Sequence, residues 1–212
     1  MPKLVLSLVF LATIFASCSV PEKENLPFLG RHEFIDRADG TTDTIYHSIK
    51  PFSFVDQDSL PITNETYKNK IYVADFFFTS CPSICPVMKV QMLRVYEKYV
   101  DNPQVGLLSH SIDPEYDNVA VLKDYAERLE VKSSKWHFVT GDKSEIYDMA
   151  QTSYYVGARE NEQAPGGYEH SGAFILVDPE RHIRGVYNGT DPESINKLLK
   201  DIDTLLQEIA EK

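Results

Sequence analysis

The stretch from Phe76 to Pro86 constrains the fold more than any other part of this 212-residue chain. Residues Ile71–Phe78 are rich in β-branched and aromatic side chains, which predicts a buried strand. Pro86 fits the first turn of a helix, where its missing N–H is no loss, so Cys85 is expected at the helix N-terminus. The helix dipole favours a thiolate there. Because Cys81 lies four residues earlier on the loop, the sequence predicts two sulfurs converging outside the carboxyl end of a strand.

Composition limits the class of protein. An apolar fraction of 42% and a charged fraction of 25% are typical of a soluble globular domain. The net charge of −11 predicts an acidic, solvated surface. It argues against nucleic acid as a partner, because binding to nucleic acid requires a basic surface.

The N-terminus predicts export. Lys3 precedes fourteen residues without a charge, Leu4–Ser17, which are too few for a membrane-spanning helix of about 20 residues but have the pattern of a secretory signal. Phe15-Ala16-Ser17-Cys18 resembles the lipobox of bacterial lipoproteins. The resemblance implies that residues 1–17 are a lipoprotein signal peptide, that Cys18 is lipidated, and that the lipid holds the protein to a membrane on the extracytoplasmic face of the bacterial cell envelope. An ordinary signal peptide and an uncleaved anchor remain alternatives.

The rest of the chain divides into three predicted parts. Residues 18–29 are polar and carry two prolines, which predicts a tether. Residues 30–50 contain short alternations around Asp39-Gly40 and predict a β-hairpin extension that caps a sheet edge. Residues 51–212 form the predicted domain.

Patterns typical of strands and helices alternate through residues 51–212. Strands are expected at Pro51–Val55, Ile71–Phe78, Val105–Ile112, Trp136–Val139, Ala173–Val177 and Ile183–Tyr187. Helices are expected to begin at Pro86 and after the capping residues Asp117, Asp142 and Asp191. This order predicts an α/β three-layer fold with a C-terminal helix. Two cysteines at the end of the first core strand make the predicted fold thioredoxin-like.

The cysteines limit the chemistry. If Cys18 carries lipid, Cys81 and Cys85 are the only thiols left among the three cysteines. They would then form a disulfide with each other, hold a metal, or cycle between states. Two thiolates with an imidazole suit Cu(I) and, with less preference, zinc.

His170 is the candidate third ligand. It ends a long, polar, Gly/Pro-rich loop at residues 157–169, just before a core strand, and in a thioredoxin-like fold that loop faces the cysteine loop. From its position alone, His170 could equally be a metal ligand or a structural residue. The other histidines are interpreted as structural or as parts of hairpins and turns: His32, His47, His110, His137 and His182.

Several motifs together resemble the Sco/SenC family of copper proteins. The pattern Phe78-Thr79-Ser80-Cys81-Pro82-Ser83-Ile84-Cys85-Pro86 with a distant His170 is specific, unlike a lone CxxC. Other segments resemble the family's SxDPxxD, WxxxTG and HS…LxDP motifs: Ser111–Asp117, Trp136–Gly141 and His170–Pro179. The resemblance covers roughly residues 50 to 210.

The resemblance implies a thioredoxin-like copper chaperone that binds one copper ion through Cys81, Cys85 and His170. Such proteins help assemble the dinuclear copper centre of cytochrome c oxidase, by delivering copper or by keeping the target's cysteines reduced. The implied partner is the copper-centre subunit of the oxidase or another cuproprotein. Asp113 matches an acidic residue of the family motif. Its role is either near the metal or in a structural turn or cap. Glu169 departs from the Asp that the family usually has before the His.

The main alternative is an extracytoplasmic thiol–disulfide oxidoreductase that uses Cys81 and Cys85. Against it, thioredoxins use CxxC and place a proline before the facing strand, where this chain has Glu169-His170-Ser171. A peroxidase needs one activated cysteine, which the proline-flanked pair disfavours. A binding module with a structural disulfide is the remaining alternative. If the protein is an enzyme, the oxidoreductase is the main hypothesis. The chaperone hypothesis requires no catalytic turnover.

Overall fold

The structure is a computed structural model and describes residues 25–211. The strands of its central sheet are β3 (Ser53–Asp56), β4 (Pro61–Thr63), β5 (Ile71–Phe77), β6 (Val105–Ser111), β7 (Trp136–Thr140), β10 (Ala173–Val177) and β11 (Ile183–Asn188). Two smaller sheets contain β1 (Glu33–Asp36), β2 (Thr42–Ile45), β8 (Ala158–Glu160) and β9 (Tyr168–His170). The helices are α1 (Cys85–Tyr99), α2 (Val119–Arg128), α3 (Lys143–Asp148) and α4 (Pro192–Ala210), with the π-helix η2 (Met149–Ser153) and the 3₁₀ turns η1 (Asn64–Tyr67) and η3 (Pro165–Gly167).

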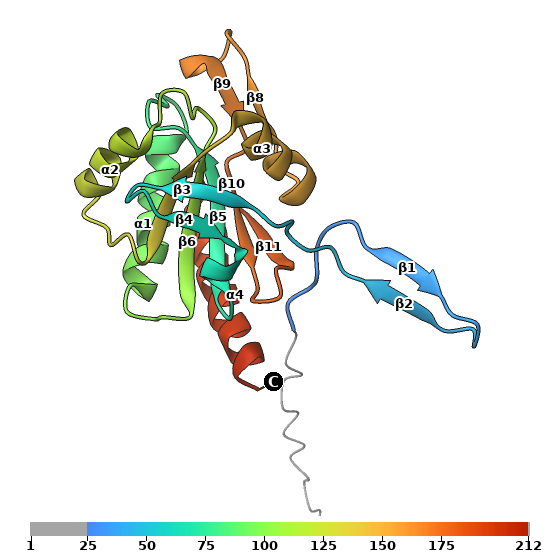
Figure 1. Ribbon diagram of the computed structural model, residues 1–212. Coiled ribbons are helices and arrows are strands. Elements are labelled where there is room, and N and C mark those ends of the chain that lie inside the picture. The colour runs from blue at the N-terminus through green and yellow to red at the C-terminus, as the bar shows by residue number, and fades with distance from the viewer. Residues whose placement is uncertain (1–24, 212) are drawn as a thin grey trace, which may run out of the picture.

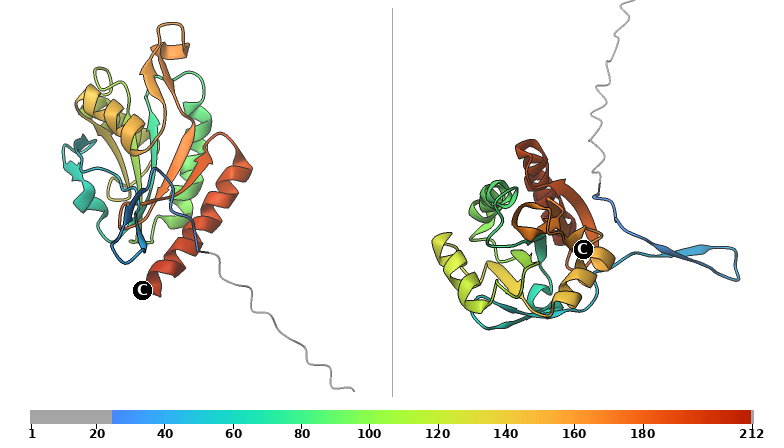
Figure 2. Two further views of the ribbon diagram at one scale, coloured as in Figure 1. Left: turned by 90° about the vertical axis from the view of Figure 1, so that its right-hand side faces the viewer. Right: turned by 90° about the horizontal axis from the view of Figure 1, so that it is seen from above.

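The central sheet has the order β11-β10-β5-β6-β7-β3-β4, in which β5, β6 and β7 are parallel. Helices α1 and α2 connect these parallel strands, and α4 lies beside α1, where the Tyr99 hydroxyl donates to Asp203 Oδ1 at 2.8 Å. Helix α3 and η2 lie on the opposite face of the sheet (Figures 1 and 2). Asp142 and Asp191 cap α3 and α4 as predicted. The three-layer α/β arrangement with a C-terminal helix is therefore confirmed.

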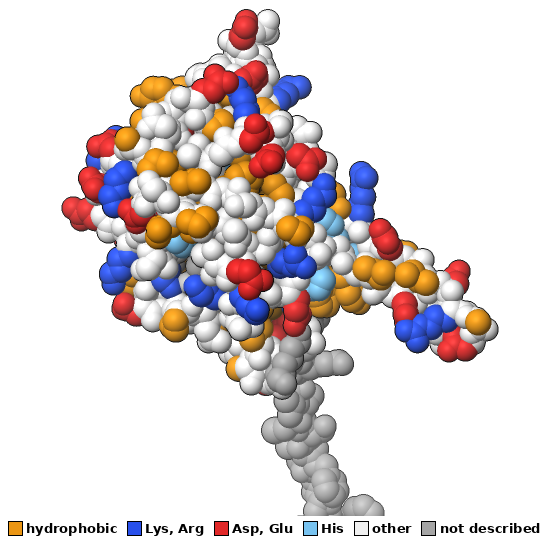
Figure 3. All heavy atoms as spheres, viewed as in Figure 1, with side chains coloured by type: hydrophobic (Ala, Val, Ile, Leu, Met, Phe, Trp, Pro, Cys, Tyr) orange, Lys and Arg blue, Asp and Glu red, His pale blue; other side chains and the backbone are white. Residues whose placement is uncertain are grey.

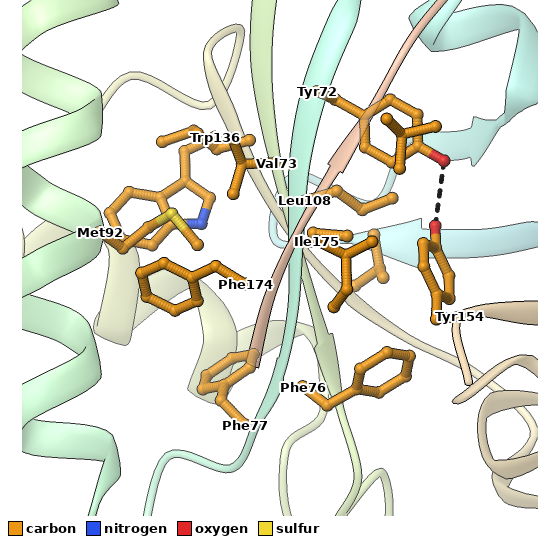
Figure 4. Packing of buried hydrophobic residues seen from close by; sticks show 14 of the residues in the cluster. Tyr72, Val73, Phe76, Phe77, Met92, Leu108, Trp136, Tyr154, Phe174 and Ile175 are labelled. Carbon is orange, nitrogen blue, oxygen red and sulfur yellow. Dashed lines mark hydrogen bonds between the residues drawn. The ribbon is translucent and has the colours of Figure 1, made fainter. Parts of the chain in front are cut away.

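Strand β5 is buried along its whole length, and its side chains alternate between two cores. Phe77 packs toward α2, with its ring centroid 5.5 Å from that of Tyr125. Phe76 points to the other face, where it stacks on His110 at 4.9 Å and lies 5.6 Å from Tyr154. Figure 4 shows the rings of Phe76 and Phe77 on opposite sides of the strand. Packing on both faces fixes the strand, and with it the position of the loop that follows.

The predicted hairpin is present but does not cap a sheet edge. Strands β1 and β2 pair with each other around the turn at Asp39-Gly40 and form a separate two-stranded sheet. This hairpin projects from the domain (Figure 1) and carries exposed hydrophobic side chains (Figure 3). Phe34 is 69% exposed and Ile35 49%. The edge strand β11 is instead bridged by Leu29, which pairs with Ile183. The expectation failed because turn signals predict a hairpin but not what the hairpin packs against.

Residues 25–29, the described part of the predicted tether, lie against the domain. Arg184 is 3% exposed and donates to the carbonyl oxygen of Leu26 at 2.6 Å. Its guanidinium forms ion pairs with Asp178 (3.2 Å) and Glu208 (2.7 Å) and lies 4.3 Å from the ring centroid of Phe28. This part of the chain therefore belongs to the domain rather than to a free tether. Residues 1–24, including the predicted signal peptide and Cys18, lie outside the described residues.

Candidate metal centre

Both cysteines lie where β5 leads into α1. Cys81 lies on the connecting loop, and its N–H donates to the carbonyl of Phe78 at 3.2 Å. Cys85 is the first residue of α1 and Pro86 the second, as the sequence predicts. Ile84 makes no side-chain capping bond and the first turn holds no acidic residue, so no carboxylate offsets the positive end of the helix dipole. Both thiols are buried, and both cysteines are free.

Asp117 anchors the loop that carries Cys81. Its carboxylate accepts hydrogen bonds from the Thr79 N–H (3.0 Å), the Thr79 hydroxyl and the Ser111 hydroxyl (2.6 Å). The prediction that Asp117 caps the next helix is wrong, because Asn118 is the N-cap of α2 and accepts from the Val121 N–H. Asp117 is fully buried and instead joins the ends of β5 and β6. This role could not be predicted from the sequence, because Asp117 and Asn118 are both suitable N-cap residues and lie side by side.

His170 ends β9, which pairs with β8 in a short antiparallel hairpin. The predicted long loop at residues 157–169 is therefore mostly ordered, because three residue pairs and the turn η3 organise it. The Nε2 atom of His170 lies 3.2 Å from Cys85 Sγ and 3.9 Å from Cys81 Sγ. Its Nδ1 lies 3.1 Å from the carbonyl oxygen of Ser171, which can only accept. Nδ1 therefore carries a proton, and Nε2 faces the sulfurs, where it can bind a metal once it is unprotonated.

These three residues form the only metal-ligand group of its kind within residues 25–211. The ligand atoms of Cys81, Cys85 and His170 all lie within 4.8 Å of one another. Three ligands placed about 2.0–2.3 Å from one ion at 120° lie roughly 3.5–4 Å apart, close to the distances found. Two soft sulfurs and an imidazole suit Cu(I), whereas structural zinc requires a fourth ligand that this group lacks. The donor set therefore fits copper.

The two thiols hold one negative charge between them. The hydrogen bond from Cys85 lowers the pKa of Cys81 to about 3, with further help from His170 and Ser83 and against the effect of burial. The same neighbouring sulfur and burial raise the pKa of Cys85 above its usual value. At neutral pH Cys81 is then the thiolate and Cys85 the thiol. A metal that took both sulfurs as thiolates would therefore release one proton on binding.

The two acidic residues singled out from the sequence do not belong to the ligand group. Asp113 accepts a hydrogen bond from the Tyr168 hydroxyl at 2.8 Å. Glu169 is held by Arg159 and by Asn161, whose amide donates to it at 2.5 Å. Asn161 and then Arg159 lower the pKa of Glu169, which stays a carboxylate. The departure from Asp to Glu therefore affects the β8–β9 hairpin rather than the metal ligands.

None of the other five histidines joins the cysteines. His110 is completely buried, and neither ring nitrogen has a hydrogen-bond partner within the described residues. His137 pairs with Asp56 at 2.9 Å. The remaining three lie near the base of the β1–β2 hairpin, where their main partners are backbone carbonyls: His32, His47 and His182.

Asp75 was missed in the sequence because it lies inside an apolar strand. Its carboxylate is buried and accepts a hydrogen bond from the Ser109 hydroxyl. Burial raises the pKa of Asp75 to about 6, against the effects of Ser109 and His170. The charge of Asp75 also contributes to the raised pKa of Cys85. A charged residue in the middle of the run Ile71–Phe78 is the signal that could have revealed it.

Comparisons with known proteins agree with the site. The chain matches the family model described as SCO1/SenC over residues 41–207. A SCO1/SenC family lipoprotein from Bacillus anthracis is 25% identical with a TM-score of 0.70, over 76% of this chain and 95% of that chain. BsSco, a member of the Sco family of cytochrome c oxidase assembly proteins in which a disulfide switch was identified, is 31% identical with a TM-score of 0.66, over 75% and 93%. Copper-bound ScoI from Arabidopsis thaliana is 25% identical with a TM-score of 0.61, over 73% and 97%.

The structural neighbours confirm the predicted thioredoxin-like fold. The family match spans most of the chain, and it includes Cys81, Cys85 and His170. It begins inside the β1–β2 hairpin and ends within α4, so the docked segment at residues 25–29 lies outside it. The chain therefore belongs to the SCO1/SenC family.

Proposed function

We propose that this protein is a copper-binding metallochaperone that helps assemble the dinuclear copper centre of cytochrome c oxidase. The observation that carries the proposal is the convergence of two sulfurs and the Nε2 atom of His170 at one edge of the sheet. The related ScoI holds copper, and the related BsSco belongs to a family of oxidase assembly proteins. The partner is the copper-centre subunit of the oxidase or another cuproprotein.

The geometry supports binding followed by release. The Cys81 thiolate attracts Cu(I), Cys85 loses its proton as it binds, and the Nε2 atom of His170 completes a three-ligand site. The buried ring of Phe78 lies 5.8 Å from that of His170 and packs beside the site. His170 comes from a small sheet that is separate from the cysteine loop. One ligand can therefore leave without unfolding the element that holds the other two.

A second candidate function is thiol–disulfide exchange, which the same two sulfurs favour. The Cys81 thiolate would attack a disulfide of the target and form a mixed disulfide. Cys85 would then attack Cys81, so that the target leaves with two thiols and the protein keeps the disulfide. Two electrons pass to the target, and the lowered pKa of Cys81 favours the first step. A disulfide switch was identified in the related BsSco.

We also propose attachment to the bacterial cell envelope through a lipid on Cys18, facing away from the cytoplasm. The related protein from Bacillus anthracis is a lipoprotein. Among residues 25–211 there is no helix whose length and hydropathy would let it span a membrane. Residues 26–29 enter at the end of the sheet opposite the cysteines (Figure 1), so a lipid anchor before them would leave the metal site facing away from the membrane. Labelling with radioactive palmitate, with Cys18→Ser as the control, tests this attachment.

A copper titration tests the chaperone proposal. The reduced full-length protein in detergent is titrated with Cu(I) and with Cu(II), alongside His170→Ala and the matched control His32→Ala, which removes an imidazole far from the cysteines. We expect one Cu(I) per chain in the parent and in His32→Ala, and an affinity on the order of 100-fold lower in His170→Ala. No binding by the parent, or equal binding by His170→Ala, would exclude this function.

A transfer assay separates the two functions. The copper-loaded protein is mixed with the soluble domain of an oxidase copper-centre subunit, supplied either with free thiols or with its thiols oxidised. Copper transfer to the reduced target that requires His170 supports the chaperone. Reduction of the oxidised target that is unchanged in His170→Ala but abolished in Cys81→Ser supports the oxidoreductase.

A further inference from the structure

The β8–β9 hairpin is the part of the site that can move. It pairs with no strand of the central sheet, and its two strands share only three residue pairs. A two-stranded hairpin is marginally stable in water unless it packs against something else. At its base the Ser171 N–H donates to the carbonyl of Gly157 at 2.8 Å, and His170 is the next residue. What holds the hairpin down therefore also sets the position of the third ligand.

We propose that Tyr168 and Asp113 form a latch that holds the β8–β9 hairpin closed, so that opening the latch withdraws His170 from the sulfurs and lets copper leave. The role of the latch in copper release rests on the proposed copper function. Its effect on the position of the hairpin is independent of that function. Neither residue is a metal ligand. Both are therefore positioning residues, and they act through His170.

The latch bond joins the hairpin to a rigid part of the domain. The Tyr168 hydroxyl donates to Asp113 Oδ1 at 2.8 Å. Asp113 is 8% exposed and is fixed by its own backbone, whose N–H donates to the Ser111 hydroxyl and whose carbonyl accepts from the Asp117 N–H. Through Ser111 and Asp117 this anchor continues to the cysteine loop. The latch thus connects the two halves of the metal site.

Contacts made by Lys143 and by Phe78 also favour the closed position. Lys143, the first residue of α3, forms ion pairs with Glu160 on β8 and with Glu115 at 3.4 Å, and its Nζ lies 5.6 Å from the Tyr168 ring centroid. Exposed ion pairs contribute little, so we assign Lys143 a supporting part. The ring of Tyr168 also packs against Phe78, with centroids 5.2 Å apart.

Gly166 lets the tip of the hairpin sit on the cysteine loop. Its φ is +78°, and a Cβ there would lie 2.8 Å from Phe78 Cε2 and 3.1 Å from Pro82 Cδ. An alanine would therefore meet both backbone strain and a clash. Because Pro82 directly follows Cys81, the closed hairpin contacts the loop beside the first sulfur. This close approach is what a larger residue at position 166 would prevent.

Opening changes the coordination without a redox step. The bond between copper and His170 Nε2 breaks, the ion stays Cu(I) on the two sulfurs, and no electrons move. Ligands of the recipient then replace Cys81 and Cys85. A recipient surface that competes for Tyr168 or Asp113 would therefore trigger release where copper is needed.

The test compares Tyr168→Phe with Tyr147→Phe in the full-length protein in detergent. Tyr147→Phe is the matched control, because its hydroxyl donates at 2.9 Å to the carbonyl of Ile112 rather than to Asp113. Each protein is loaded with one Cu(I), and the rate of transfer to excess bathocuproine disulfonate is measured. We expect Tyr168→Phe to release copper about fivefold to tenfold faster, the effect of one lost hydrogen bond to a carboxylate, and Tyr147→Phe to match the parent within about twofold.

Hydrogen exchange of the metal-free protein gives a readout that does not depend on copper. Backbone amides of β8 and β9 should exchange faster in Tyr168→Phe, while those of β5 and β6 should be unchanged. Gly166→Ala should increase exchange in the same two strands. Parent-like exchange and release in Tyr168→Phe would overturn the latch. A parent that binds no Cu(I) would overturn the proposed function, and hydrogen exchange would still decide whether the latch exists.

Discussion

The two ends of the central sheet differ in whether their buried ionisable groups have partners of opposite charge. At the anchor end, where residues 26–29 dock, Arg184 neutralises two buried carboxylates, those of Asp178 and Glu208. At the site end, where β5 and β6 lead to the cysteines, Asp117 is buried and no residue within 25–211 forms an ion pair with it. His110 is buried there without any hydrogen-bond partner in the described chain. At the anchor end the buried charges are paired, which stabilises the fold. At the site end, buried ionisable groups without an ion-pair partner among residues 25–211 lie next to the metal site, where their burial lowers stability.

This contrast predicts that stability and copper binding can be separated by mutation. Removing charge from the anchor end should destabilise the fold and leave the metal site intact. Changing the unpaired groups at the site end should alter copper binding, pH response, or both. The following changes are ordered from the largest expected effect to the smallest.

Arg184→Met should have the largest effect on stability. It leaves Asp178 and Glu208 buried without their cation, which lowers the free energy of unfolding by about 3–5 kcal/mol. Urea unfolding measures the loss, and Arg128→Met is the control because its ion pair with Asp124 is exposed. Copper affinity of the folded variant should match the parent within about twofold. A loss of copper affinity in folded Arg184→Met would show that the two ends are coupled.

Asp117→Ala should lower both stability and copper affinity. Three donors lose their acceptor: the Thr79 N–H, the Thr79 hydroxyl and the Ser111 hydroxyl. We expect about 2–3 kcal/mol less stability, because buried donors are left unsatisfied. We also expect roughly 10- to 100-fold weaker Cu(I) binding, as for other residues that support metal ligands. Asp117→Asn keeps one acceptor oxygen and should fall between Ala and the parent; unchanged copper affinity in Asp117→Ala would contradict the anchoring role.

His110 and Asp75 should change the free energy of unfolding in opposite directions as the pH falls. Burial lowers the pKa of His110 to about 3, so the unfolded chain binds more protons below its usual pKa, and stability falls as the pH drops below about 6.5. Burial raises the pKa of Asp75 to about 6, so the folded state takes up the proton first, and stability rises as the pH drops through about 6. Each slope is about 1.4 kcal/mol per pH unit, and near pH 5 the two largely cancel.

Urea unfolding between pH 7 and pH 5 can resolve the two groups. Relative to the parent, His110→Leu should gain stability toward pH 5, and Asp75→Asn should lose it. Because each variant is compared with the parent at the same pH, the contributions of other groups cancel to first order. Parallel curves for His110→Leu and the parent would mean that this histidine is protonated in the folded protein.

The sequence was sufficient for the parts of the site that local patterns determine. Pro86 placed Cys85 at the start of a helix, and the structure has it there. The position of His170 before a core strand, together with the family motif, selected it from the histidines, and the structure brings it to 3.2 Å from Cys85. These predictions depend on residues that are close in the chain, or on a fold class that strand and helix order already defines.

The rest depended on contacts between residues far apart in the chain. The docking of residues 26–29 requires Arg184, which nothing near it in the sequence indicates. The order of the β8–β9 hairpin depends on a bond between Tyr168 and Asp113, 55 residues apart. Gly- and Pro-rich composition predicts a loop equally well whether or not such a bond exists. The role of Asp117 was hidden for the same reason, because its partner Thr79 lies 38 residues earlier.

Shortening the β1–β2 hairpin should have the smallest effect, although it leaves the domain at the anchor end. Its strands share none of the buried charges there, and its stabilising contacts are its own, such as the ion pair between Arg37 and Asp43. Replacing residues 34–44 with Gly-Gly keeps Tyr46, which stacks on Phe28 at 4.2 Å. We expect a change in unfolding free energy of about 0.5 kcal/mol or less and unchanged Cu(I) affinity. A large loss of stability would mean that the anchor end extends into the hairpin, and that residues 26–29 stay docked only while the hairpin is intact.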